Sequence, residues 1–197
     1  NPLFSASVTS GLCMTNASMD QINIQFYKTK VAEFILGSFD GSLCLLDFRY
    51  RRMRAAVDKR LQKGVGAEFV ERDNDILQMA RTQIDEYLRG SRQEFDLPLL
   101  MVGSDFQRSV WNGLMEVPYG STISYLELAR QINQVEAVRA VASANGANAI
   151  AIIIPCHRII GSNGDLVGYG GGLPLKKRLL TLEQGDEPKY TTYDLFG

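Results

Sequence analysis

The segment IAIIIP, residues 150–155, restricts the architecture of this chain more than any other stretch. An uninterrupted run of mainly β-branched residues is typical of a short strand that is covered on both faces. Such a strand needs packed elements on either side, so the chain must build a layered core. Its 197 residues, 45% of them hydrophobic, are enough for one large domain or two small ones.

The residues that follow this run indicate chemistry. Pro155 lacks a backbone donor and ends strand pairing, and it is followed by Cys156 and by His157, the only histidine of the chain. A thiol is a nucleophile as the thiolate, which a base or a positive charge on His157 or Arg158 would favour. Since adjacent side chains of an extended segment point in opposite directions, we expect a bridging water to carry the thiol proton to His157. Glu183 is a candidate for the carboxylate that orients the imidazole.

Residues 1–98 predict a small N-terminal α/β domain, in which residues 1–20 form a partly ordered lead-in. Asp40-Gly41 lies between the apolar runs 31–37 and 43–48, a pattern that predicts a β-hairpin. One helix is expected to end near Gly64 and a second to span residues 73–90. We interpret the charges of RYRRMRAAVDKRLQKG, residues 49–64, as a solvated helix face, and we predict no catalytic cluster in this domain.

Residues 99–185 predict a mainly helical C-terminal domain, after an extended linker around Pro98. Asp105 is expected to cap its first helix, and Ser124 with Glu127 forms a capping box for the next. An alanine-rich helix follows after a short connection, which gives a helix-turn-helix pattern, and the short strand IAIIIP then leads to Cys156. A glycine-rich loop, a last helix with Pro174 in its first turn and a tail, residues 186–197, complete an α+β fold.

Composition excludes several classes of function. The formal net charge of −1 gives no basic field, so a DNA partner would have to be bound by locally placed charges. Three widely spaced cysteines fit a reducing compartment, and one histidine without a CxxC motif cannot build a zinc site. We expect no metal, no cofactor and no membrane span. The chain begins at Asn1 rather than at methionine, so a leader or a larger fused region could precede it.

The motifs of residues 103–184 resemble the O6-alkylguanine-DNA alkyltransferases, also called methylated-DNA–protein-cysteine methyltransferases. The PCHR signature is present, and the resemblance extends in order and spacing over FQRSVWNGLMEVPYGSTISYLELA, AVRAVASANGAN and IIIPCHRIIGSNGDLVGYGGGLPLKKRLL, and then Glu183. The N-terminal half is more loosely similar to the variable N-terminal domain of that family.

The resemblance implies a suicide DNA-repair protein that flips an alkylated guanine out of the duplex. Cys156 would accept the alkyl group from O6 of guanine, and no cofactor would be needed. The resemblance leaves open whether O4-methylthymine is also a substrate. His157, Glu183 and Asn148 would be the other catalytic residues. Tyr125, Tyr169 and Gly170 would bind the extruded base, and Arg139 would fill its place in the duplex.

The resemblance also implies that double-stranded DNA is bound through the minor groove by a monomer, in the cytoplasm or in a eukaryotic nucleus. The expected DNA contacts are Ser124, Tyr125, Arg139, Ala140, Ala142, Ser143 and Gly146. Gly170 stands where relatives often carry a bulkier or hydroxyl residue, so the alkyl sizes that the pocket accepts stay open.

Two other classes of function compete with this interpretation. A sensor of alkylated DNA or a helix-turn-helix regulator would use the same surface without transferring the alkyl group. A thiol hydrolase or redox enzyme would use Cys156 on small esters or peroxides, but the adjacency of Cys156 and His157 and the lack of a nearby resolving cysteine disfavour it.

Overall fold

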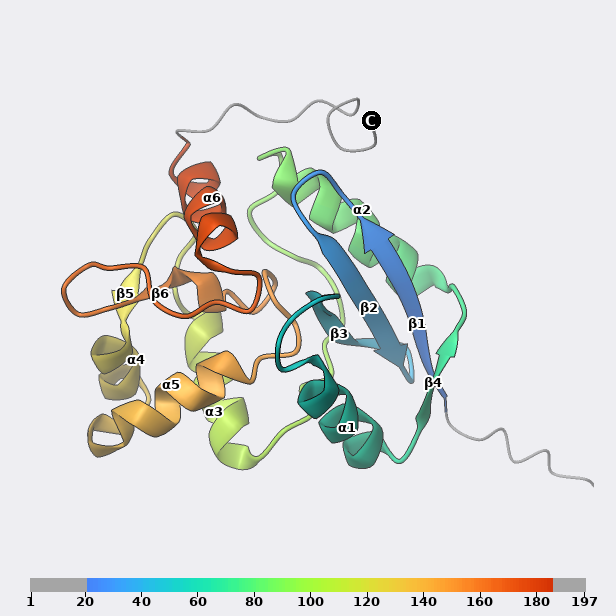
Figure 1. Ribbon diagram of the computed structural model, residues 1–197, viewed down its shortest axis with the longest axis horizontal. Coiled ribbons are helices and arrows are strands. Elements are labelled where there is room, and N and C mark those ends of the chain that lie inside the picture. The colour runs from blue at the N-terminus through green and yellow to red at the C-terminus, as the bar shows by residue number, and fades with distance from the viewer. Residues whose placement is uncertain (1–20, 186–197) are drawn as a thin grey trace, which may run out of the picture.

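Figure 1 shows the computed structural model, which describes residues 21–185 of the chain. The predicted lead-in over residues 1–20, Cys13 and the tail over residues 186–197 lie outside the described residues. The α+β fold is confirmed, because a sheet with two helices is followed by a mainly helical half. Within residues 21–185, no helix combines the length and apolarity that crossing a membrane requires.

The N-terminal half is built on a four-stranded sheet in the order β3-β2-β1-β4. Its strands are β1 (Gln21–Lys28), β2 (Glu33–Phe39), β3 (Ser42–Phe48) and β4 (Glu68–Glu71). The predicted hairpin is confirmed: β2 and β3 are antiparallel, and Asp40 and Gly41 both have positive φ, as a two-residue hairpin turn requires. Strand β1 was not predicted, although its apolar Ile22, Ile24 and Phe26 alternate with polar residues.

Helices α1 (Arg54–Val65) and α2 (Asp75–Leu88) cover opposite faces of this sheet. Phe34 and Leu36 of β2 belong to the core cluster that includes α2, while Ile35 belongs to the cluster that includes α1. Alternate side chains of β2 therefore pack on opposite faces of the sheet. The predicted helix over residues 73–90 is confirmed, and Asn74 caps it by accepting from the backbone N–H of Leu77 at 3.0 Å.

The C-terminal half contains α3 (Asp105–Met115), α4 (Tyr125–Gln131), α5 (Val138–Gly146) and α6 (Leu173–Gln184). Its short elements are β5 (Ile123–Ser124), β6 (Ile159–Ile160) and the 3₁₀ turns η1 (Val135–Ala137) and η2 (Cys156–Arg158). The capping box of Ser124 and Glu127 is confirmed. The cap of α3 is Ser104 and not Asp105, because the Ser104 hydroxyl accepts from the Gln107 backbone in a second capping box.

The strand predicted over residues 150–155 is wrong for most of its length. Ile150 forms one parallel bridge with Leu46 of β3, and the chain then turns so that Ala151 bridges Ile154. Ile152 has a φ of 70°, a conformation that costs a β-branched residue roughly 1–3 kcal/mol. The run is buried as expected, but it forms a tight turn whose end delivers Cys156 to η2.

The two halves share one core. The backbone of β3 is hydrogen-bonded to two segments of the second half, since Leu100 N–H donates to Leu43 O at 2.9 Å and Ala151 N–H donates to Leu46 O at 2.6 Å. The cluster beneath α2 continues without interruption through α3 and α5 to α6. The turn that carries Cys156 is therefore supported by the N-terminal sheet.

Candidate active site

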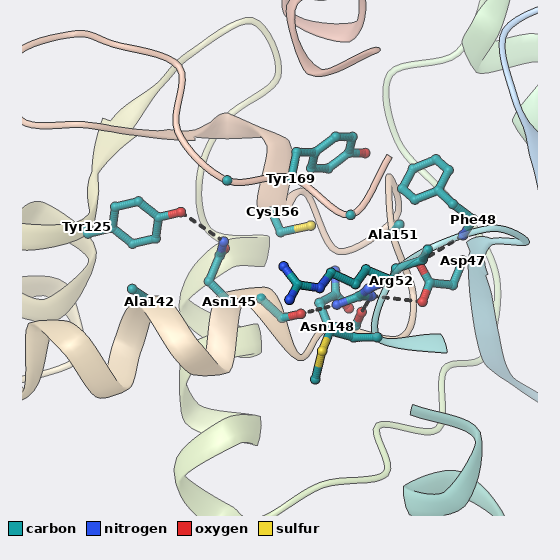
Figure 2. A pocket seen from close by; sticks show the side chains of 15 residues that line it. Asp47, Phe48, Arg52, Tyr125, Ala142, Asn145, Asn148, Ala151, Cys156 and Tyr169 are labelled. Carbon is teal, nitrogen blue, oxygen red and sulfur yellow. Dashed lines mark hydrogen bonds and ion pairs between the residues drawn. The ribbon is translucent and has the colours of Figure 1, made fainter. Parts of the chain in front are cut away.

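Cys156 lies at the first position of η2, at the wall of a cavity of about 260 Å³. Figure 2 shows Tyr125 and Asn145 on one side of the thiol and Asp47 and Phe48 on the other, with Tyr169 beside it. The side chain is largely buried. The cavity brings together several predicted site residues, namely Tyr125, Ala142, Gly146, Asn148, Cys156, Tyr169 and Gly170.

His157, which follows Cys156 in η2, forms a buried pair with Glu183. The imidazole Nε2 lies 2.8 Å from Glu183 Oε1, and both side chains are fully buried. An ionised carboxylate there requires a proton on Nε2, which leaves Nδ1 unprotonated. Among the described residues, Nδ1 has no hydrogen-bond partner, so it is the nitrogen that can accept a proton.

Glu183 is held as a carboxylate by cationic and neutral donors. Arg158 donates from Nε to Oε2 at 2.9 Å and from Nη2 to Oε1 at 3.0 Å, and Gly120 N–H donates to Oε2 at 3.0 Å. Burial raises the pKa of Glu183, but the hydrogen bonds and charges of His157 and Arg158 outweigh it and lower the pKa to about 2. Burial, in turn, lowers the pKa of His157 and so favours the neutral imidazole.

Asn148 ties the turn that carries Cys156 to the end of α5. Its Nδ2 donates to Ile154 O at 2.8 Å, and its Oδ1 accepts from Ile150 N–H at 2.9 Å. Burial raises the pKa of the Cys156 thiol, whereas a hydrogen bond from Asn148 and the charge of Arg51 act in the opposite direction. The resting group is thus a thiol that needs a base.

The expected DNA-contacting residues occupy different positions around this cavity. Arg139, Ala140 and Ser143 are exposed on α5, outside the cavity lining. Ser124 is largely buried, because its hydroxyl caps α4. Tyr125, in the first turn of α4, accepts a long hydrogen bond from Asn145 Nδ2 at 3.5 Å.

Comparison with known proteins assigns this arrangement to a family. Residues 22–101 match the ribonuclease-like domain of 6-O-methylguanine DNA methyltransferase, and residues 105–185 match its DNA binding domain. A methylated-DNA–protein-cysteine methyltransferase of Methanosarcina barkeri is 47% identical over 81% of this chain and 95% of its own length. The chain belongs to the methylated-DNA–protein-cysteine methyltransferase family.

Other members of the methyltransferase family agree with this assignment. The inducible enzyme of Bacillus subtilis is 49% identical, over 60% of this chain and 66% of its own length. OGT of Mycobacterium tuberculosis in complex with DNA has a TM-score of 0.70 and 36% identity, and the match covers 85% of this chain and 95% of that one. The expected family is therefore confirmed.

Two contributions to this methyltransferase site were missed by sequence reasoning. Tyr87 of α2 is fully buried, donates to Glu183 Oε1 at 2.7 Å and lies 3.3 Å from His157 Nε2. The charge of Arg158 was expected to act on the thiol, but its guanidinium is turned to Glu183 and to Val117 O. Residues 156–158 form the 3₁₀ turn η2 and not the extended segment that was expected, and the sequence carries no signal for the partner of Arg158.

The N-terminal half also lines the cavity, which the sequence did not indicate. It contributes Asp47, Phe48, Arg51, Arg52 and Met53. The interpretation of the charges of residues 49–64 as a solvated helix face is wrong in part: α1 begins only at Arg54, and Arg51 and Arg54 both pair with the buried carboxylate of Asp47. Such distant pairings leave no periodic pattern in a sequence.

Proposed function

We propose that this protein repairs alkylated DNA by direct reversal, taking the alkyl group of O6-alkylguanine irreversibly onto the sulfur of Cys156. The observation that carries the proposal is the position of Cys156, at the wall of a cavity next to α5 and one residue before His157, which pairs with Glu183. A guanine in a duplex hides its O6, so the nucleotide has to be flipped into this cavity, at a cost of a few kcal/mol.

The residues divide the chemistry among them. His157 Nδ1 takes the thiol proton, through a water, while Glu183 and Arg158 stabilise the ring in the required tautomer. The sulfur–carbon bond forms as the bond between the alkyl carbon and O6 breaks, and the proton ends on the restored guanine, which remains in the DNA. The thioether has no leaving group, so each molecule reacts once.

Helices α4 and α5 present the DNA-binding surface. Small residues, among them Ala140, Ser143 and Gly146, let α5 approach the minor groove closely, and Arg139 occupies the space of the flipped base. Tyr125 and Tyr169 hold the extruded base. The protein acts as a monomer, in the cytoplasm or in the nucleus of a eukaryote, and its free Cys44 and Cys156 fit a reducing compartment.

The test is the intact mass after incubation with a short duplex that contains one O6-methylguanine. We expect a gain of one methyl group per molecule, located on Cys156 by peptide mapping and abolished in Cys156→Ala. Cys44→Ala is the matched control, since burial raises the pKa of that buried thiol to about 12 and it should take no part. Binding to the damaged duplex without any gain in mass would favour the sensor over the transferase.

A further inference from the structure

Arg51 reaches from the N-terminal half into the methyltransferase site. It lies between β3 and α1, and its side chain is only 8% exposed. Its Nη1 donates to Asp47 Oδ2 and to Asn148 O, each at 2.8 Å, and its Nη2 donates to Gly146 O. A single guanidinium therefore joins the sheet to the end of α5.

The same side chain fills the space beside the glycine-rich loop. A Cβ added at Gly170 would lie 3.3 Å from Cδ and Nε of Arg51, closer than most real contacts. The absence of a side chain at Gly170 therefore leaves room for Arg51. It does not widen the cavity, because Arg51 fills this space. Arg51 contacts the helix end, the Asn148 turn and the loop next to Tyr169.

The anchor of Arg51 is the fully buried Asp47, which also pairs with Arg54 Nη1 at 2.8 Å. Arg54 differs from Arg51 in its second partner, which is the carboxylate of Asp58 in α1, at 2.7 Å. Arg60 of α1 adds a second cationic contact to the end of α5, donating to Ala147 O at 2.7 Å. Cations at a helix C-terminus satisfy its free carbonyls and complement its dipole.

We propose that Arg51 is a positioning residue for the transfer reaction, through which the N-terminal half sets the Asn148 turn, the end of α5 and the Gly170 loop around Cys156. The inference rests on the proposed function. Arg51 acts through the backbone carbonyls of Gly146 and Asn148, and Asn148 in turn holds the carbonyl of Ile154, two residues before Cys156. Loss of Arg51 should loosen the geometry of the thiol more than it weakens the DNA-binding face, because Arg51 bonds to that face only at the backbone oxygen of Gly146, while Arg139 and Ser143 are exposed on α5.

The experiment measures single-turnover methyl transfer against the concentration of O6-methylguanine duplex, which separates the limiting rate constant from the half-saturating concentration. Arg51→Met should lower the limiting rate constant on the order of 10-fold to 100-fold, as small misplacements of reacting groups do. The half-saturating concentration should change less than about threefold. Arg51→Lys, which keeps a charged donor, should recover part of the rate.

Arg54→Met is the matched control, because it removes the other arginine of Asp47 and leaves the contacts to Gly146 and Asn148 intact. We expect it to lower stability, as Arg51→Met does, and to leave the limiting rate constant within about threefold of the wild type. Equal limiting rate constants in the two variants would overturn the positioning role. If Arg51→Met does not fold, Arg51→Lys against Arg54→Lys gives the same comparison.

The two proposals fail in different ways. If the wild-type protein takes up no methyl group, the proposed function is wrong, whatever the variants do. If the wild type reacts at Cys156 while Arg51→Met and Arg51→Lys react as fast, the transfer reaction stands and the role of Arg51 is wrong.

Discussion

The carboxylate of Glu183 accepts hydrogen bonds from side chains on two elements that are far apart in the sequence, Tyr87 of α2 and His157 and Arg158 of η2. Glu183 and His157 were predicted as a pair from their resemblance to family motifs, and the structure brings them together. Tyr87 could not be predicted, because a tyrosine on the apolar face of a helix is usually a core residue. Its role depends on a contact across 96 positions of the chain.

The pKa values of Glu183 and His157 predict that acid destabilises the fold. The pKa of Glu183 is lowered from 4.5 to about 2, so its stabilisation is complete above pH 4.5 and is lost as the pH falls toward 2. The pKa of His157 is also lowered, so protonation of the unfolded chain below pH 6.5 acts in the same direction. Glu183 should account for about 3 kcal/mol.

Chemical denaturation of the wild type and of Glu183→Gln across this pH range checks the prediction. The variant should be less stable at pH 7, and its free energy of unfolding should fall less between pH 4.5 and 2. Parallel curves for the two proteins would contradict the assignment of an ionised Glu183.

Tyr87→Phe tests the contribution of the Tyr87 hydroxyl, which was not predicted from the sequence, to the stability of the fold. It removes a buried hydrogen bond to a carboxylate, so the free energy of unfolding should fall by roughly 1.5–3 kcal/mol, as measured by urea denaturation. Tyr119→Phe is the control: the Tyr119 ring packs edge-on against Tyr87 at 6.3 Å, and its hydroxyl has no hydrogen bond among the described residues. A smaller loss in Tyr87→Phe than in Tyr119→Phe would argue against this network.

At the scale of elements, sequence signals that depend on neighbouring residues predicted the structure correctly. The apolar run at residues 150–154 did not. The hairpin at Asp40-Gly41, α2 and the cap of α4 all depend on contacts within a few residues, and each was predicted. The run at residues 150–154 satisfies its need for burial equally well as a turn, and composition cannot distinguish the two. The bridge to Leu46 and the bonds of Asn148, which decide between them, lie elsewhere in the chain.

The two capping boxes give a matched test of what α4 contributes. Ser124→Ala and Ser104→Ala should each cost about 1 kcal/mol of stability, since each removes a hydroxyl that accepts from the first turn of a helix. Only Ser124→Ala should weaken binding to duplex DNA, because α4 carries Tyr125. Denaturation and a fluorescence titration with duplex measure the two effects, and equal affinities for the two variants would count against α4 as a DNA-binding element.

At the scale of the whole molecule, the division at residues 98–99 stays a prediction, and the shared core implies that the halves unfold together. Far-UV circular dichroism and the fluorescence of Trp111 should therefore report one coincident urea transition. Trp111 is suited to this measurement, because it is buried and donates to Ala144 O of α5 at 2.9 Å. Two separated transitions would show that the halves are independent.

The complementarity of Arg51 and Gly170 also bears on how such chains can diverge. A Cβ at position 170 would lie 3.3 Å from the side chain of Arg51 in the other half, so any larger residue there would require Arg51 to shift. Recombination that joined this N-terminal half to a C-terminal half with a bulky residue at position 170 would bring two side chains into the same space. Chimeric proteins that combine Arg51 with a bulky residue at position 170 should therefore be less stable than chimeras that keep Gly170.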